Sequence, residues 1–124
     1  MNILDRNNVH VQGKTAPVLF YAHGFGCNQA MWNHITPAFS NTHQQVLFDY
    51  VGSGKSDLAS FDIKRYSSLQ GYAQDILDVC DALSLSSGIT FVGHSVSCSI
   101  GILASIARPK LFERLVLIGP SLAF

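Results

Sequence analysis

Four short, mostly apolar runs along the chain have the length and composition of β-strands. They are residues 17–22, 46–48, 89–92 and 115–118. Residues 17–22 are apolar throughout, which is typical of a strand in a parallel sheet that is covered on both faces, and residues 46–48 predict the next buried strand. Because the sequence ends soon after residues 115–118, we expect that run to be an uncovered edge of the sheet. A shorter segment, residues 9–11, alternates apolar with polar positions and predicts a half-buried edge strand.

The segment with the clearest helical periodicity is residues 67–83, where apolar and acidic residues separate onto opposite faces. The apolar face consists of Leu69, Tyr72, Ile76, Val79, Cys80 and Leu83, and the acidic face of Asp75, Asp78 and Asp81. The acidic face is predicted to be solvated. Ser67 with Gln70 is predicted to cap the start of this helix.

Two further helical segments complete the pattern. Apolar residues recur at steps of three and four between Met31 and Phe39, which predicts a helix that Pro37 kinks or ends. The small apolar residues of 98–107 predict another helix. The resulting order β-α-β-α-β-α-β predicts an α/β fold with a mostly parallel sheet, right-handed crossovers and helices on both faces. No repeat, low-complexity tract or linker divides residues 1–124, so we expect a single domain.

Composition and charge narrow the classes of function. The 124 residues are 48% hydrophobic, which is enough for one core of moderate size. Eight basic and eight acidic side chains give a formal net charge of zero, which argues against nucleic acid and anionic membranes as partners. The amino terminus lacks a basic region followed by an apolar stretch. The longest apolar run, residues 100–107, is far shorter than the roughly 20 residues of a membrane-spanning helix. We therefore predict a cytoplasmic protein.

The cysteines and histidines form no metal-binding pattern. Cys27, Cys80 and Cys98 are odd in number and lack Cys-x-x-Cys spacing, which argues against a disulfide framework or a thiolate metal site. The five histidines also lack metal-type spacing. We expect reduced thiols, no metal and no cofactor.

The most informative motif is Gly-His-Ser-Val-Ser at residues 93–97, where a predicted strand, a sharp turn and a predicted helix meet at Ser95. Such a turn holds the serine in a strained backbone conformation that exposes its Oγ, and it requires small residues two positions to either side. Gly93 and Ser97 meet this requirement. The motif therefore predicts a nucleophile elbow with Ser95 as the catalytic nucleophile.

Acyl transfer at a serine also needs an oxyanion hole, which consists of backbone N–H donors aimed at the developing negative charge. In the elbow architecture, one donor is the residue after the nucleophile and another lies in the loop after an early strand. Val96 is the first candidate, and Phe25, in the His-Gly-Phe-Gly turn at residues 23–26, is the second. A plain tight connection at residues 23–26 is the alternative interpretation of that turn.

Residues 52–56, Gly-Ser-Gly-Lys-Ser, resemble part of a phosphate-binding loop. The full pattern requires a glycine at position 49, where the chain has Asp49. The segment that follows, residues 57–62, is acidic and lacks the helical opening that an anion favours. Nucleotide binding is therefore disfavoured.

No residue is an obvious proton acceptor for Ser95. Enzymes with this elbow place an acidic residue and then a histidine after the serine, and the 29 residues that follow Ser95 contain neither aspartate nor histidine. His94 is expected to pack or hydrogen-bond beneath the turn, and His23 is a weak candidate for the base. Asp49, at a strand end, is better explained as a cap of the turn after it. The sequence alone completes no catalytic triad.

Several separated motifs together resemble the α/β-hydrolase family. They are residues 23–26, 48–57, 71–75, 92–97 and 103–109. The chain is most similar to the RsbQ branch, which includes the plant strigolactone and karrikin receptors. The resemblance implies a three-layer α/β-hydrolase fold, a Ser-His-Asp triad that includes Ser95, and a helical cap over a pocket for a small hydrophobic signal molecule. It also implies a PAS-domain phosphatase as partner in a stress response.

The resemblance leads to one expectation about the extent of the chain and three about its function. A complete domain of this kind commonly needs about 200 to 250 residues. We therefore expect residues 1–124 to be the amino-terminal part of one domain, truncated after the strand that follows the elbow helix, with the rest of the triad and the cap beyond Phe124. The leading hypothesis is a serine hydrolase for a small apolar ester or lactone-like signal. The alternatives are a non-enzymatic signalling or binding module and an inactive truncated product.

Overall fold

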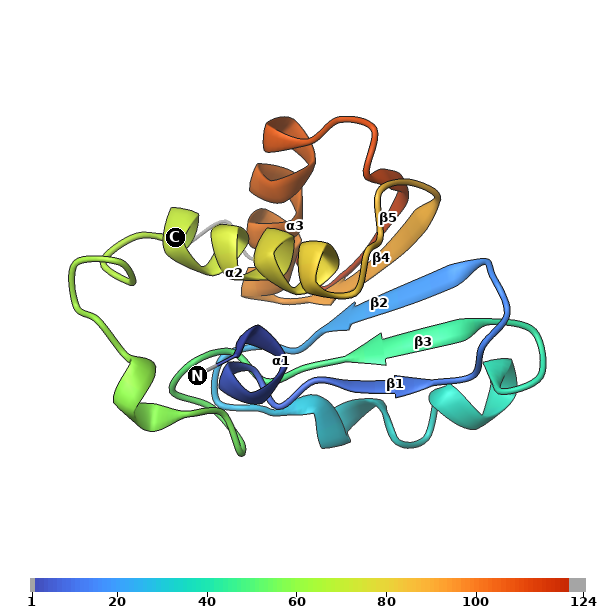
Figure 1. The fold of residues 1–124 in the computed structure, drawn as a ribbon, viewed down its shortest axis with the longest axis horizontal. Helices are drawn as coiled ribbons and strands as arrows, with labels where there is room; N and C mark the ends of the chain where they lie inside the picture. The colour runs from blue at the N-terminus through green and yellow to red at the C-terminus, as the bar shows by residue number, and fades with distance from the viewer. Residues whose placement is uncertain (1, 121–124) are drawn as a thin grey trace.

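The computed structural model describes residues 2–120, which form a five-stranded sheet with its α-helices against one face (Figure 1). The elements are α1 (Ile3–Arg6), β1 (His10–Gln12), β2 (Val18–Ala22), the 3-10 helices η1 (Gln29–Trp32) and η2 (Thr36–Phe39), β3 (Gln44–Leu47), the 3-10 helix η3 (Leu58–Ser60), α2 (Leu69–Ala82), β4 (Ile89–His94), α3 (Val96–Ala107) and β5 (Phe112–Ile118). Within this range, no helix combines the length and the apolar character that crossing a membrane requires.

The sheet has the strand order β1-β3-β2-β4-β5. Strand β1 runs antiparallel to β3, and the other neighbouring strands are parallel. All five residues of the central strand β2 are buried, which explains why its sequence is apolar throughout. The predicted parallel sheet and the edge strand near residues 9–11 are therefore confirmed, but β1 is exposed along its length and not half-buried.

The two faces of the sheet are covered differently. Val18, Phe20 and Ala22 of β2 face the core beneath α2 and α3, whereas Leu19 and Tyr21 face the opposite side together with Trp32. Within residues 2–120, only the 3-10 helices η1 and η2 lie on that opposite side, so α-helices cover one face and not both. An apolar groove of about 340 Å³ stays open there, and Val116 and Ile118 of β5 form part of its wall.

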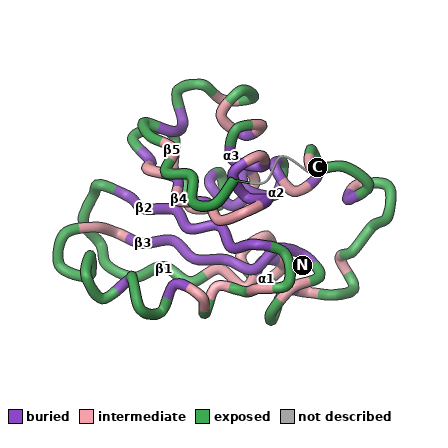
Figure 2. The backbone as a smooth tube through the Cα atoms, turned by 180° about the vertical axis from the view of Figure 1, so that it is seen from behind, coloured by how far each residue is buried: buried purple, intermediate pink, exposed green. Residues whose placement is uncertain are grey.

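Strand β5 is the edge opposite β1. It is longer than the predicted run, beginning at Phe112, and most of its residues are exposed. Figure 2 shows this contrast, with β2 and β3 largely buried and exposed backbone along the outer part of the molecule.

The continuous helix predicted between Met31 and Phe39 is wrong. The structure has two short 3-10 helices there, separated by a turn. Pro37 lies in the first turn of η2, where its missing N–H is tolerated, but an α-helix cannot run through it from η1. Ile35 and Phe39 are consequently exposed at the rim of the groove.

The predicted start of α2 also needs correction. The helix begins at Leu69 with Ser68 at the N-cap, and the Ser67 hydroxyl donates to the Lys64 carbonyl instead of capping the helix. The N-cap is therefore one residue later than predicted.

The acidic face of α2 is solvated only in part. Asp75 is fully buried, and its carboxylate binds Arg6 at 3.1 Å, Arg65 at 2.5 Å and the Tyr66 hydroxyl at 2.6 Å. Helical periodicity placed Asp75 on the outer face, but α1 and the loop before α2 fold over it and supply two cations. Burial, together with the Asp75 carboxylate, raises the pKa of Tyr66 to about 12.

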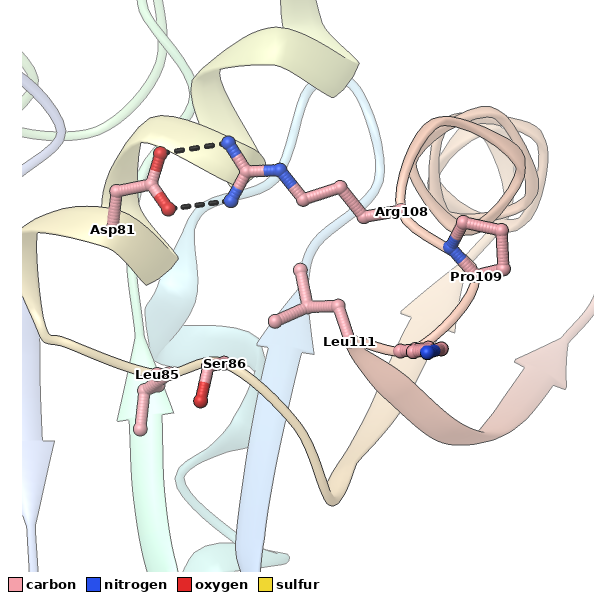
Figure 3. Close-up of a pocket in the computed structure, with 7 residues that line it drawn as sticks. Asp81, Leu85, Ser86, Arg108, Pro109 and Leu111 are labelled. Atoms are coloured by element: carbon pink, nitrogen blue, oxygen red, sulfur yellow. Dashed lines mark hydrogen bonds and ion pairs between the residues drawn. The ribbon is translucent and has the colours of Figure 1, made fainter.

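Asp81, one turn after Asp78, fits the prediction because it lies on the surface and forms a two-armed ion pair with Arg108 (Figure 3). The pair borders a pocket of about 430 Å³ whose wall includes Leu85 and Leu111. Leu85 and Leu111 come shortly before β4 and β5, and Asp81 and Arg108 lie at the ends of α2 and α3. The pocket therefore lies at the amino ends of the strands, whereas Ser95 follows the carboxyl end of β4.

Candidate active site

Ser95 occupies a strained turn between β4 and α3. Its backbone has φ 60° and ψ −119°, a conformation that non-glycine residues rarely adopt. The Ser95 N–H donates to the Ile118 carbonyl at 3.0 Å, and the Ser95 carbonyl accepts the Cys98 N–H at 3.0 Å. Strand β5 and helix α3 together therefore hold the strained residue in place.

Small residues around Ser95 let the strand and the helix approach. A Cβ at Gly93 would lie 2.7 Å from the Phe91 ring and 3.1 Å from the Ser97 carbonyl oxygen. Further along α3, a Cβ at Gly101 would collide with the same ring. This close packing is the reason that the elbow requires small residues at positions 93 and 97.

The turn at residues 23–26 lies directly against the elbow. Ala22, at the end of β2, pairs with Gly93, so the two loops leave the same edge of the sheet. A Cβ at Gly24 would lie 3.4 Å from the Ser95 Cβ and 2.7 Å from His94 Nδ1. A Cβ at Gly24 would have to displace the elbow, so the close approach of the two loops requires glycine at this position.

The two predicted oxyanion donors differ in exposure. Val96 is the first residue of α3 and is buried, whereas the Phe25 side chain is 45% exposed. Within residues 2–120, no acceptor takes the backbone N–H of either residue. The first amides of a helix have no partner inside the helix, and the Val96 amide is one of these. Two backbone donors without an acceptor are therefore close to the elbow in the chain: Val96 directly follows Ser95, and Phe25 directly follows Gly24, which packs against Ser95.

His23 is a structural residue and not a base for Ser95. The Tyr50 N–H donates to His23 Nε2 at 3.1 Å, so the proton of the neutral ring resides on Nδ1, which donates to the Gly24 carbonyl at 2.7 Å. Both nitrogens are thus occupied. Burial lowers the pKa of His23 below its ordinary 6.5, against the opposing effects of the Gly24 hydrogen bond and the Asp49 charge.

This buried neutral histidine makes stability depend on pH. Below pH 6.5 the unfolded chain binds a proton at His23 that the folded chain does not. Unfolding is therefore increasingly favoured as pH falls below 6.5. The contribution of the neutral His23 to stability is complete only above this pH. Urea unfolding at about pH 7.5 and about pH 5.5 should show a loss of unfolding free energy on acidification.

His23→Gln should reduce this pH dependence, whereas the matched change at the exposed His34, His34→Gln, should preserve it. An identical pH dependence of unfolding in both variants would contradict the assignment of this dependence to the buried His23. Asp49 does not interfere, because its ordinary pKa of 3.8 is lowered in the fold and it titrates in a more acidic range.

His94 packs beneath the elbow, in agreement with the sequence expectation. Its ring contacts the position that a Cβ of Gly24 would occupy. Within residues 2–120, its buried Nδ1 has no hydrogen-bond partner. Its role in these contacts is to fill space between the elbow and the turn at residues 23–26.

The loop that resembles a phosphate-binding loop is organised around an internal carboxylate. Asp49 accepts the N–H groups of Gln29 at 2.9 Å and Lys55 at 3.0 Å, and the Asn8 side-chain amide at 2.9 Å. Burial would raise the pKa of Asp49, but these donors lower it. Gly54 packs on the same carboxylate. Asp49 therefore caps the turn that follows it, as its position at a strand end predicted.

Comparison with known proteins adds the family. A model of the alpha/beta hydrolase fold matches residues 17–124, most of the chain. This chain belongs to the α/β-hydrolase family. Its relatives include the strigolactone esterase D14 of Arabidopsis thaliana, 46% identical over 99% of this chain and 46% of that protein. The karrikin insensitive 2 receptor CA of Petunia hybrida is 41% identical over 94% of this chain and 43% of that protein.

Solved structures agree with this assignment. A hydrolase from Oleispira antarctica superposes with a TM-score of 0.91 at 42% identity, covering 96% of this chain and 43% of that one. The α/β-hydrolase fold and the resemblance to the strigolactone and karrikin branch are thereby confirmed. The chain spans less than half the length of these relatives.

Two of the cysteines of this α/β-hydrolase family member are buried. Cys98 is buried, with its Sγ 3.5 Å from the Gly93 carbonyl, and burial raises the pKa of its thiol. Burial raises the pKa of the Cys80 thiol to about 12. In the described part of the chain, no three His, Cys, Asp or Glu side chains come together as a metal site would require.

Sequence reasoning overlooked Glu113, the acidic residue that follows Ser95 in the chain. Glu113 lies near the start of β5, beside Arg114. Because Ile118 at the other end of β5 pairs with His94, Glu113 is about five residues, or roughly 16 Å, from the elbow along the strand. It does not belong to the site.

Sequence reasoning also missed Tyr50. Its hydroxyl lies 2.6 Å from Ser97 Oγ, although 47 residues separate the two in the chain. The position of Tyr50 directly after a strand end was the available signal, since the carboxyl ends of parallel strands meet at one edge of the sheet.

Proposed function

We propose that this chain supplies the nucleophile and the oxyanion hole of an RsbQ-type serine hydrolase that acts on small apolar ester or lactone-like signal molecules. The observation that carries the proposal is the strained Ser95 with two unpaired amides beside it, from Phe25 and Val96. Two relatives, the strigolactone esterase of Arabidopsis thaliana and the karrikin insensitive 2 receptor of Petunia hybrida, support the same class.

The proposed reaction begins with attack of Ser95 Oγ on the carbonyl carbon of the substrate. The carbonyl electron pair moves onto oxygen, and the amides of Phe25 and Val96 stabilise this oxyanion. Collapse of the tetrahedral intermediate releases the alcohol portion and leaves an acyl-serine, which water then hydrolyses.

The proton of Ser95 needs an acceptor during the attack. Both nitrogens of His23 are already occupied, and within residues 2–120 no histidine is hydrogen-bonded to Ser95. We therefore place the base outside the described residues, on a further segment or another chain.

An aromatic cleft supports the apolar substrate class. It has a volume of about 470 Å³, and its wall includes Phe25, Tyr66, Leu69 and Tyr72. Phe25 thus contributes its amide to the proposed oxyanion hole and its side chain to the cleft. Aromatic walls of this kind suit a small hydrophobic molecule with few polar groups.

The branch to which the chain is most similar adds two proposals about context. A PAS-domain phosphatase is the proposed protein partner, and stress-response regulation in the cytoplasm is the proposed setting. A second candidate function, ligand binding without turnover, is favoured by the receptor among the relatives and by the lack of a histidine hydrogen-bonded to Ser95 within residues 2–120.

Covalent labelling tests the proposed nucleophile. A fluorophosphonate should form an adduct in the native protein, and mass spectrometry should find it on the peptide that contains Ser95. Ser95→Ala should abolish labelling, whereas Ser99→Ala, on the same helix, should retain it. Hydrolysis of p-nitrophenyl acetate should follow the same pattern.

Two results would contradict the hydrolase. Labelling that persists in Ser95→Ala would remove this residue from the site. Absence of both labelling and hydrolysis in the native protein would instead favour the binding module, which Ser95→Ala should leave able to bind its ligand.

A further inference from the structure

We propose that Tyr50 and Ser97 are positioning residues for the oxyanion loop, because their hydroxyls link the end of β2 to the first turn of α3. This inference rests on the proposed function, since it concerns the geometry of the Phe25 amide. It adds two side chains that act through the loop and touch no substrate.

The direction of the hydroxyl chain follows from its end point. Ser97 Oγ lies 2.5 Å from the His23 carbonyl oxygen. A carbonyl oxygen only accepts, so the Ser97 hydroxyl donates to it. The Tyr50 hydroxyl, 2.6 Å from Ser97 Oγ, must then donate to Ser97. Each hydroxyl therefore donates to one defined acceptor, so the hydrogen bonds of this chain have a single arrangement.

Tyr50 also holds the loop through its backbone. Its N–H donates to His23 Nε2, and the other side of the same ring donates to the Gly24 carbonyl. The two routes from Tyr50 therefore meet at consecutive residues, His23 and Gly24, immediately before Phe25. The hydrogen bonds connect three segments at one edge of the sheet, which are the residues after β2, the residues after β3 and the start of α3.

Burial makes these bonds decisive for the local geometry. Tyr50, Ser97 and His23 are fully buried, so water cannot replace a lost partner. The Tyr50 ring is also edge-on to Phe25, at 6.1 Å between ring centroids. Loss of the hydroxyl chain would leave the His23 carbonyl unpaired and free the loop to shift.

A small shift of this loop affects the chemistry specifically. Substrate binding depends on the cleft walls, but the Phe25 amide stabilises charge that exists only in the transition state. A displaced donor therefore lowers kcat and leaves KM nearly unchanged. A residue that only maintained stability would lower the number of folded sites and leave kcat per site unchanged.

The test measures kcat and KM for p-nitrophenyl acetate in the native protein, normalised to active sites titrated with a fluorophosphonate. Ser97→Ala and Tyr50→Phe should each lower kcat by roughly 10- to 100-fold, as expected for a misplaced catalytic group. The double variant should lose little more than either single one, because both act through the same carbonyl. Ser99→Ala, the same change two residues further along α3, is the matched control and should keep kcat.

Wild-type kcat per titrated site in Ser97→Ala, or a full additive loss in the double variant, would overturn the proposal. A second measurement keeps its failure separate from failure of the hydrolase. Amide hydrogen exchange of the chain should be faster at Gly24 and Phe25 in Ser97→Ala than in Ser99→Ala, whether or not the protein turns over an ester. Equal exchange in the two variants would refute the positioning role by itself.

Discussion

Phe25→Pro should lower kcat/KM for p-nitrophenyl acetate in the native protein by about 100-fold or more, which corresponds to about 3 kcal/mol of transition-state stabilisation. Proline lacks the backbone N–H, so the substitution removes one proposed oxyanion donor. The loop at Phe25 is exposed, and no acceptor within residues 2–120 takes this N–H. The substitution therefore breaks no hydrogen bond of the resting fold.

Phe25→Leu is the matched control, because it changes the side chain and retains the amide. We expect a mild effect, mostly on KM, since the Phe25 ring lies in the wall of the aromatic cleft. Thermal unfolding of both variants should verify that the fold is intact. Equal kcat/KM values for the two variants would exclude the Phe25 amide from the oxyanion hole.

The second large effect concerns stability. Asp75→Ala should lower the free energy of unfolding by about 3 kcal/mol, because it leaves two guanidinium groups without their buried carboxylate. Arg6 and Arg65 both bind Asp75, and their side chains are only 13% and 34% exposed. The Tyr66 hydroxyl loses its acceptor as well. Urea unfolding of the chain measures the change.

Asp81→Ala provides the comparison for Asp75→Ala, since it removes an aspartate from the same helix. Its ion pair with Arg108 is exposed, with side-chain exposures of 55% for Asp81 and 39% for Arg108. Solvent and salt weaken such pairs, so this variant should unfold almost like the wild type. Similar losses of unfolding free energy in the two variants would show that the burial of Asp75 does not determine its contribution to stability.

The two aspartates illustrate how far helical periodicity predicts. It placed Asp75 and Asp81 on the outer face of α2, and the structure confirms this position for Asp81 alone. Periodicity reports only the orientation of a residue on its own helix. Whether that face meets solvent depends on α1 and the loop before α2, whose paths the pattern of α2 does not contain.

The segment between Met31 and Phe39 shows a second limit. Its apolar spacing matched a helix, and the sequence also contained the residue that prevents one, Pro37. The spacing of these residues serves packing at the open face of the sheet, where Trp32 is buried against Tyr21. Two short 3-10 helices give similar spacing, so periodicity alone could not distinguish them from one continuous helix.

What the sequence determined by itself was local. Apolar runs specified the strands, and the small residues at positions 93 and 97 specified the elbow at Ser95, because both features depend on neighbours within a few residues. Only the tertiary structure decided which strands are buried, which nitrogens of His23 are occupied and which hydroxyls support the loop at residues 23–26. Ser97 and His23 are 74 residues apart in the chain and 2.5 Å apart in the fold. Such pairs form because parallel strands bring their carboxyl ends to one edge of the sheet, and the partner at that edge is set by strand order, which no single segment encodes.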